Sequence, residues 1–238
     1  MFQYLRILSF AFLIIPTTVF AAAKYVLPKQ IQATYVVSKN GKLFAEVREK
    51  YIVKGNSYLV ESTTKGFGVY ALLGERKLIS MGKVTNQGLK PIHFELHQGN
   101  NERKKLSTDF DWSNNTLHMV IKGEVEDVPL TSGTQDLANF SYQFMFLPKP
   151  IKNDLIILLT TGKKLNKYHY RVKSEKETLS VAGQQYKTIH LVPVNNNNQQ
   201  ETKELWLATE QSYILVRFLM LDENGEKLEQ TLTELHVQ

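Results

Sequence analysis

The sequence of 238 residues contains no cysteine. The chain therefore has no disulfide, no cysteine-ligated metal site, no thiol nucleophile and no cysteine to carry a lipid at a cleavage site. Long apolar runs are also lacking, because no stretch beyond the N-terminus is apolar enough for a membrane span, which needs about 20 residues. Stability must come from a buried core, and the chain is long enough to form one.

The N-terminus has the pattern of a secretory signal peptide. One early cation, Arg6, precedes an apolar run over residues 7–15, which Pro16 and several small residues follow. The run is too short to cross a bilayer, so it predicts cleavage rather than anchoring. Cleavage fits after either Ala21 or Ala23. With residues 1–23 taken as the signal peptide, we expect residues 24–238 to form a single soluble domain, exported to the periplasm and not a lipoprotein.

Neither sign of charge dominates the chain. Lysine and arginine number 29 against 23 acidic residues, which gives a formal net charge of +6. The basic residues cluster only at 103–105 and 163–164, and neither cluster has the interleaved aromatic residues of a nucleic-acid platform. We therefore expect no nucleic-acid partner.

Strand patterns dominate the sequence. Asn40-Gly41 and Asn224-Gly225 lie between apolar-rich runs, which predicts tight hairpins because both residues of such a turn need positive φ. Residues 43–53 alternate between apolar and polar, as expected for a strand with one buried face. The polar run at 195–200 predicts a surface hairpin tip. Together these patterns predict a predominantly all-β domain, built as a curved antiparallel sheet or an open β-barrel with one packed amphipathic helix.

The helix is predicted from Gln135 to Leu147. Ser132 and Gln135 have the spacing of a capping box, and Asp136 would lie in the first turn, where the helix dipole favours a carboxylate. Apolar residues recur at spacings of three, four and three along one side of this helix: Leu137, Phe140, Phe144 and Leu147. Each notable residue of the segment thus has a structural explanation, and we expect the helix to cover the concave face or the open end of the sheet.

Catalytic patterns are incomplete. His93, Glu95 and His97 share one face of a strand, but the two histidines stand ~13 Å apart, too far to ligate one zinc ion. A metal shared by His93 and Glu95 needs a ligand from a neighbouring strand. Asp109 and Asp111 also share a face, which suits paired acids but is more typical of a solvated turn.

Hydroxyl chemistry near Ser132 and Asp136 would need a histidine supplied by the fold. The Gly-x-Ser-x-Gly elbow of hydrolases and the glycine-rich phosphate loop do not occur in the sequence. We therefore expect no catalytic residue, no metal and no cofactor.

The strongest binding pattern is an apolar run between Gly66 and Gly74. The favoured interpretation is that it caps the open end of the sheet as core, because apolar runs usually bury themselves. The alternative is a lip over a hydrophobic cavity that holds an acyl chain or a partner protein. The ligand-binding candidates are then Phe67, Tyr70, Leu72 and Leu73 of the run, with Phe140 and Phe144 of the helix.

Several short segments together resemble the DUF3108 family of exported bacterial proteins. They are Gly55-x-x-Tyr58-x-x-Glu61-Ser62, Asp109-Phe110-Asp111-Trp112, Val128-Pro129-Leu130, Gly133-Thr134-Gln135-Asp136, Tyr168-x-x-x-Val172, Gly183-x-x-Tyr186-x-Thr188, and Trp206-Leu207-Ala208 leading to Val216-Arg217. The family pattern prefers proline where this chain has Thr209 and Leu215, which affects turn geometry only. The resemblance implies an exported, sheet-rich domain and supplies no catalytic residues.

Two classes of function follow from these patterns. The favoured hypothesis is a non-enzymatic protein of the cell envelope that binds a lipid, another apolar ligand or a partner protein on a curved sheet. The alternative is a hydrolase or metal-dependent enzyme of the envelope that uses residues near Asp136 or the face of His93 and Glu95.

Overall fold

The computed structural model describes residues 27–99, 104–194 and 202–238. The predicted signal peptide and the predicted polar hairpin tip at 195–200 lie outside these ranges. Within them, no helix is long and apolar enough to cross a membrane.

Fifteen strands form one sheet. In chain order they are β1 (Gln30–Lys39), β2 (Lys42–Lys54), β3 (Ser57–Gly66), β4 (Arg76–Thr85), β5 (Gly88–Gln98), β6 (Leu106–Asp111), β7 (Thr116–Ile121), β8 (Glu124–Pro129), β9 (Gln135–Asp136), β10 (Leu155–Thr160), β11 (Leu165–Val181), β12 (Gln184–Pro193), β13 (Thr202–Ala208), β14 (Ile214–Leu221) and β15 (Lys227–Val237). The helical elements of the described residues are η1 (Gly68–Leu73), α1 (Phe140–Gln143) and η3 (Phe144–Phe146).

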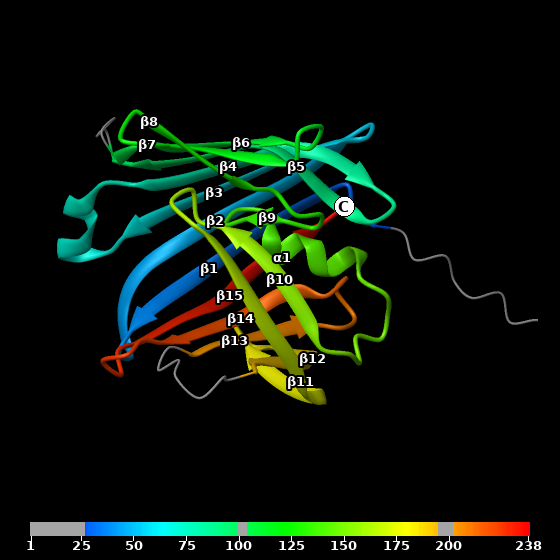
Figure 1. Cartoon of the computed structure of the whole chain (residues 1–238). Helices are drawn as coiled ribbons and strands as arrows, with labels where there is room; N and C mark the ends of the chain where they lie inside the picture. The colour runs from blue at the N-terminus through cyan, green and yellow to red at the C-terminus, as the bar shows by residue number, and fades with distance from the viewer. Residues whose placement is uncertain (1–26, 100–103, 195–201) are drawn as a thin grey trace, which may run out of the picture.

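The strand order is β8-β7-β6-β5-β4-β3-β2-β1-β15-β14-β13-β12-β11-β10-β9. The first and last strands are therefore neighbours at the middle of the sheet. The ladders between neighbours are antiparallel except that of β9 with β10, which is parallel. The sheet curves strongly around α1, as Figure 1 shows, and in the described residues β8 and β9 stay unpaired with each other. The prediction of a predominantly all-β domain, built as a curved antiparallel sheet or an open β-barrel with one packed helix, is confirmed: the sheet is curved and unclosed, and the α-helix is short.

Both Asn-Gly pairs lie in hairpins, as predicted. Asn40 and Gly41 have φ of 51° and 77° and connect β1 to β2. This left-handed pair matches the twist of the two strands, so it directs β2 back along β1. Gly225, with φ of 77°, lies in the wider loop between β14 and β15.

The two ends of the sheet approach each other across the concave side. Gln135 of β9 donates its side-chain amide to the carbonyl oxygen of Leu89 on β5 at 3.0 Å. Ser80 of β4 donates to the carboxylate of Asp136 at 2.6 Å. These bonds involve side chains rather than a backbone ladder, so the sheet folds over itself without closing.

Apolar side chains from the concave face and the α1 segment form three packed clusters. One contains Tyr51, Tyr58, Phe94, Leu117, Met119 and Tyr142; a second contains Tyr35, Val47, Trp206, Val216 and Leu232; the third contains Phe144, Ile151, Leu191, Leu205, Leu207 and Leu215. The first and third clusters meet at α1, because Tyr142 of α1 belongs to the first and Phe140 of α1 packs against the third. The core therefore holds α1 between the two halves of the sheet.

The predicted helix from Gln135 to Leu147 begins too early. Gln135 and Asp136 form β9 and pair with β10, while α1 begins only at Phe140. Asp136 accepts hydrogen bonds from the amides of Ala138 and Asn139 at 2.9 and 3.1 Å, which bends the chain into a turn before the helix. Pairing with β10 thus prevails over the helical periodicity.

The predicted capping box is wrong as well. Asn139 stands at the N-cap of α1, where it makes no side-chain cap bond, and Ser132 lies exposed well before the helix. The side chain of Gln135 is turned away to Leu89 instead of reaching back to a cap residue. Ser132 and Gln135 have the spacing of a capping box, but no helix begins between them, because α1 begins at Phe140.

The favoured interpretation of the run between Gly66 and Gly74 is also wrong. The run forms η1 at the tip of the β3–β4 hairpin, and none of the residues of η1 is buried. Leu72 is 89% exposed and Leu73 is 62% exposed. The run is an exposed apolar turn rather than core.

Candidate functional site

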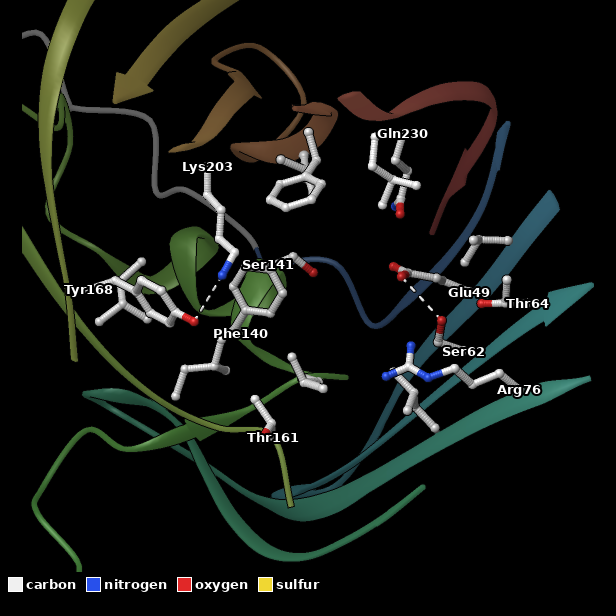
Figure 2. A pocket seen from close by; sticks show the side chains of 18 of the residues that line it. Glu49, Ser62, Thr64, Arg76, Phe140, Ser141, Thr161, Tyr168, Lys203 and Gln230 are labelled. Carbon is white, nitrogen blue, oxygen red and sulfur yellow. Dashed lines mark hydrogen bonds between the residues drawn. The ribbon is translucent and has the colours of Figure 1, made fainter. Parts of the chain in front are cut away.

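A cavity of about 300 Å³ lies on the concave side of the sheet, against α1 (Figure 2). Its apolar wall consists of Val47, Leu78, Leu137, Phe140, Ile157, Leu159, Leu215, Phe218 and Leu228. Its polar side chains are Glu49, Ser62, Thr64, Arg76, Ser141, Thr161, Tyr168, Tyr170, Lys203 and Gln230. An apolar cavity with a few placed polar groups is the usual form of a small-molecule site, although this one is at the small end of the range.

Strand register brings the polar groups of one wall together. Val47, Thr64 and Arg76 lie in one row across β2, β3 and β4. Glu49 and Ser62 lie in the next row, on the same face, because side chains two residues apart along a strand point the same way. This wall therefore presents a carboxylate, two hydroxyls and a guanidinium to the cavity.

Glu49 is the acid of the cavity. Its carboxylate accepts hydrogen bonds from Tyr142 of α1 at 3.0 Å and from Ser62 at 3.4 Å. Burial raises the pKa of Glu49 to about 7, since these two neutral donors only partly offset the loss of water. Tyr142 also stacks on Tyr51, with ring centroids 5.0 Å apart, which fixes the phenol toward Glu49. Glu49 thus joins α1 to the sheet and changes its charge near neutral pH.

Arg76 is the first residue of β4, and Figure 2 shows its side chain extending into the cavity near Ser62. Burial lowers its pKa, because the surroundings hold little water to solvate the guanidinium. At the opposite end of the cavity Lys203 donates to the phenol oxygen of Tyr168 at 3.2 Å. The cavity consequently has an apolar middle with a cation at each end.

Asp136 lies outside the cavity in a closed hydrogen-bond network. It is fully buried, and its carboxylate accepts from the hydroxyl of Ser80 and from two backbone amides. Tyr58 joins the network, contacting Ser80 at 3.0 Å and accepting from the side chain of Asn139 at 2.7 Å. Burial raises the pKa of Asp136 to about 7 against the effect of these donors. The arrangement ties the turn before α1 to β3 and β4, and it shields Asp136 from any substrate.

The histidine face of β5 forms a surface network with the adjacent strand. His93 contacts Asp109 at 2.5 Å and Glu95 at 3.1 Å, while His97 contacts Glu95 at 2.7 Å. Partial burial of Glu95 acts to raise its pKa, but the hydrogen bonds from His97 and His93 outweigh this effect and lower the pKa to about 2. Asp111, the other candidate acid, accepts from the backbone of the following turn. No group of three or more potential ligands is placed to hold a metal ion in the described part of the chain.

The structure separates the predicted ligand-binding residues. Phe140 lines the cavity, whereas Phe144 is buried in the core beside it. Phe67, Tyr70, Leu72 and Leu73 lie on the exposed η1 turn and do not line the cavity.

η1 nevertheless adjoins the cavity, because the strands that it connects carry Thr64 and Arg76 at that end of the site (Figure 2). The sequence analysis missed Glu49, Arg76, Tyr168 and Lys203. Each lies in a strand as a single polar or amphipathic residue, and the chain gives no local signal that its side chain faces inward.

The sheet and the cavity lie within a segment of the chain that matches a known protein family. Residues 30–233 match the family described as "Protein of unknown function (DUF3108)". The chain belongs to the DUF3108 family. The match spans the sheet from β1 into β15, so the DUF3108 region contains every residue that lines the cavity. A search of curated proteins gave no match.

Two solved structures resemble this DUF3108 protein at 12% sequence identity each. One is a chain of the MucA/MucB complex of Pseudomonas aeruginosa, with a TM-score of 0.39; the similarity covers 87% of this chain but only 51% of that one. The other is a putative outer membrane lipoprotein-sorting protein domain from Vibrio parahaemolyticus, with a TM-score of 0.26, which covers 88% of this chain and 85% of that one.

Proposed function

We propose that this DUF3108 protein is a non-enzymatic protein of the cell envelope that holds an apolar ligand, such as an acyl chain, in the cavity between the curved sheet and α1. The observation that carries the proposal is the wall of that cavity, which α1, β10, β14 and β15 line with leucine, isoleucine and phenylalanine. Covering apolar surface in a cavity with an apolar ligand is favourable by about 25 cal/mol per Å² of surface removed from water. The predicted signal peptide supports the location.

The exposed η1 turn supports the same function. It follows directly from the strand that carries Thr64, at one end of the cavity, and Leu72 and Leu73 are solvent-exposed there. Exposed apolar groups at the end of an apolar cavity suit a lip over which the ligand enters. Phe67 and Tyr70 belong to the same turn, and Tyr70 packs against Phe44 of β2, with ring centroids 4.6 Å apart.

The test is native mass spectrometry of the mature protein released from its own envelope, followed by extraction and lipid analysis. A cavity-blocking variant, Ser141→Trp, places an indole in the cavity, because Ser141 lines it. Ser180→Trp is the matched control, since Ser180 is exposed on β11. We expect a stoichiometric adduct with an acyl chain on the wild type and on Ser180→Trp, and its loss from Ser141→Trp.

Two results would contradict this function. An adduct that persists in a folded Ser141→Trp protein would place the ligand elsewhere. A ligand-free wild-type protein that instead copurifies with a stoichiometric partner would favour a protein-binding scaffold.

A further inference from the structure

Arg76 places a cation in a cavity whose walls are mostly apolar. It stands opposite Thr64 in the ladder between β3 and β4, and it points to the same side of the sheet as Leu78. A guanidinium stays charged at every physiological pH and offers five donors in a planar fork. Its position therefore places a partly buried positive charge in the cavity wall.

The charge of Arg76 has no counterpart in the described structure. Over residues 27–99, 104–194 and 202–238, no carboxylate is within ion-pair distance of Arg76 and no hydrogen bond to its guanidinium is formed. Two other arginines are paired: Arg48 with Glu46 at 2.7 Å and Arg217 with Glu229 at 2.7 Å. An unpaired charge withdrawn from water is costly, so a paired arrangement is strongly favoured at this position.

The register of the sheet explains why Glu49 does not pair with Arg76. Glu49 lies two strands away and one row further along the cavity, where Ser62 and Tyr142 donate to its carboxylate. Burial raises the pKa of Glu49 and lowers that of Arg76, which are the directions expected when neither group neutralises the other. Among the described residues no side chain supplies the anion that would complement Arg76, so the site is suited to an anionic group of a ligand.

We propose that Arg76 binds the anionic headgroup of an amphiphile whose single apolar chain lies along Phe140 in the cavity. This inference rests on the proposed function and names the chemical class of its ligand. The guanidinium fork fits both a carboxylate and a phosphate through two parallel hydrogen bonds. The volume of about 300 Å³ favours one chain over two, because it is at the small end of ligand cavities.

The test measures displacement of Nile red, a neutral apolar fluorophore, from the mature protein. The competitors are dodecanoate, dodecyl phosphate and 1-dodecanol, which share one chain length and differ in headgroup, each below its critical micelle concentration and at neutral pH. We expect at least one of the two anions to displace Nile red at a concentration about tenfold lower than the alcohol, which is about 1.4 kcal/mol. Whichever anion acts more strongly identifies the headgroup as carboxylate or phosphate.

Three variants assign this preference to Arg76. Arg76→Gln should remove the preference for anions, so that dodecanoate, dodecyl phosphate and 1-dodecanol displace Nile red at similar concentrations. Arg76→Lys should restore it in part, because lysine keeps the charge but lacks the fork. Arg48→Gln is the matched control, since the side chain of Arg48 is 74% exposed on the other face of β2, and it should behave as the wild type.

Failure of this inference is distinguishable from failure of the proposed function. If the alcohol and both anions displace Nile red equally from the wild type, or if Arg48→Gln has the same effect as Arg76→Gln, the headgroup inference is overturned while apolar binding stands. If Nile red does not bind and no competitor binds, the proposed function itself is contradicted.

Discussion

Asp136 provides the sharpest test of the structure, because the sequence and the fold assign it different roles. As a helix-dipole residue it would contribute about 1 kcal/mol or less. In the structure its fully buried carboxylate satisfies the amides of Ala138 and Asn139 and the hydroxyl of Ser80. Asp136→Ala leaves two buried amides without acceptors, at about 1–3 kcal/mol each. Ser80 can still bond Tyr58, so we expect a total loss of about 3 kcal/mol.

The assay is equilibrium unfolding in urea at neutral pH, followed by circular dichroism. Asp136→Asn should cost about 1 kcal/mol, because its remaining carbonyl oxygen still accepts from the two amides. Ser132→Ala, at the position of the predicted capping box, should change the free energy of unfolding by about 0.5 kcal/mol or less, since Ser132 is exposed. A cost at Ser132 equal to that at Asp136, or a neutral Asp136→Ala, would refute the network as the role of this segment.

Two further predictions concern the cavity and its lip. Leu72→Ser combined with Leu73→Ser should change stability by about 0.5 kcal/mol or less but weaken dodecanoate binding in the Nile red assay; marked unfolding would mean that η1 is core. Glu49 has a pKa of about 7 in the folded protein against an ordinary value of 4.5. Its contribution to the free energy of unfolding is therefore complete below pH 4.5 and is lost as pH rises through 7. Urea unfolding of the wild type should therefore show falling stability from acidic to mildly alkaline pH. Glu49→Gln should remove on the order of 2 kcal/mol of that fall, allowing for the partial exposure of Glu49 to the cavity, and retain the share from Asp136, whose pKa is also about 7. A pH dependence identical in the wild type and Glu49→Gln would contradict burial of this carboxylate.

The sheet was predictable because its signals are local. Asn40-Gly41 determines a hairpin by the backbone conformations that those two residues tolerate, and alternation along β2 determines which face is buried. The predicted helix was too long because the apolar periodicity from Leu137 to Leu147 contains no information about strand pairing with residues far along the chain. Pairing of β9 with β10, twenty or more residues away, takes Gln135 and Asp136 out of the helix.

The cavity was not predictable for a related reason. Arg76 and Glu49 each appear in the sequence as ordinary polar residues of a strand. Their meeting on the concave side depends on the register of three strands and on the curvature that brings α1 against them. The apolar run of η1 was wrongly predicted to be core, because apolar composition favours burial but does not show whether other elements cover the segment. In the structure none of the residues of η1 is buried.

The central claim is that an apolar chain lies between the sheet and α1, and photocrosslinking tests it most directly. Dodecanoate carrying a diazirine near the end of its chain is bound to the mature protein, irradiated, and the modified peptides are sequenced by mass spectrometry. We predict crosslinks to cavity side chains around Phe140, Phe218 and Leu228, and their loss in Ser141→Trp. Crosslinks confined to η1 or to the outer face of β2, unchanged by Ser141→Trp, would contradict the account.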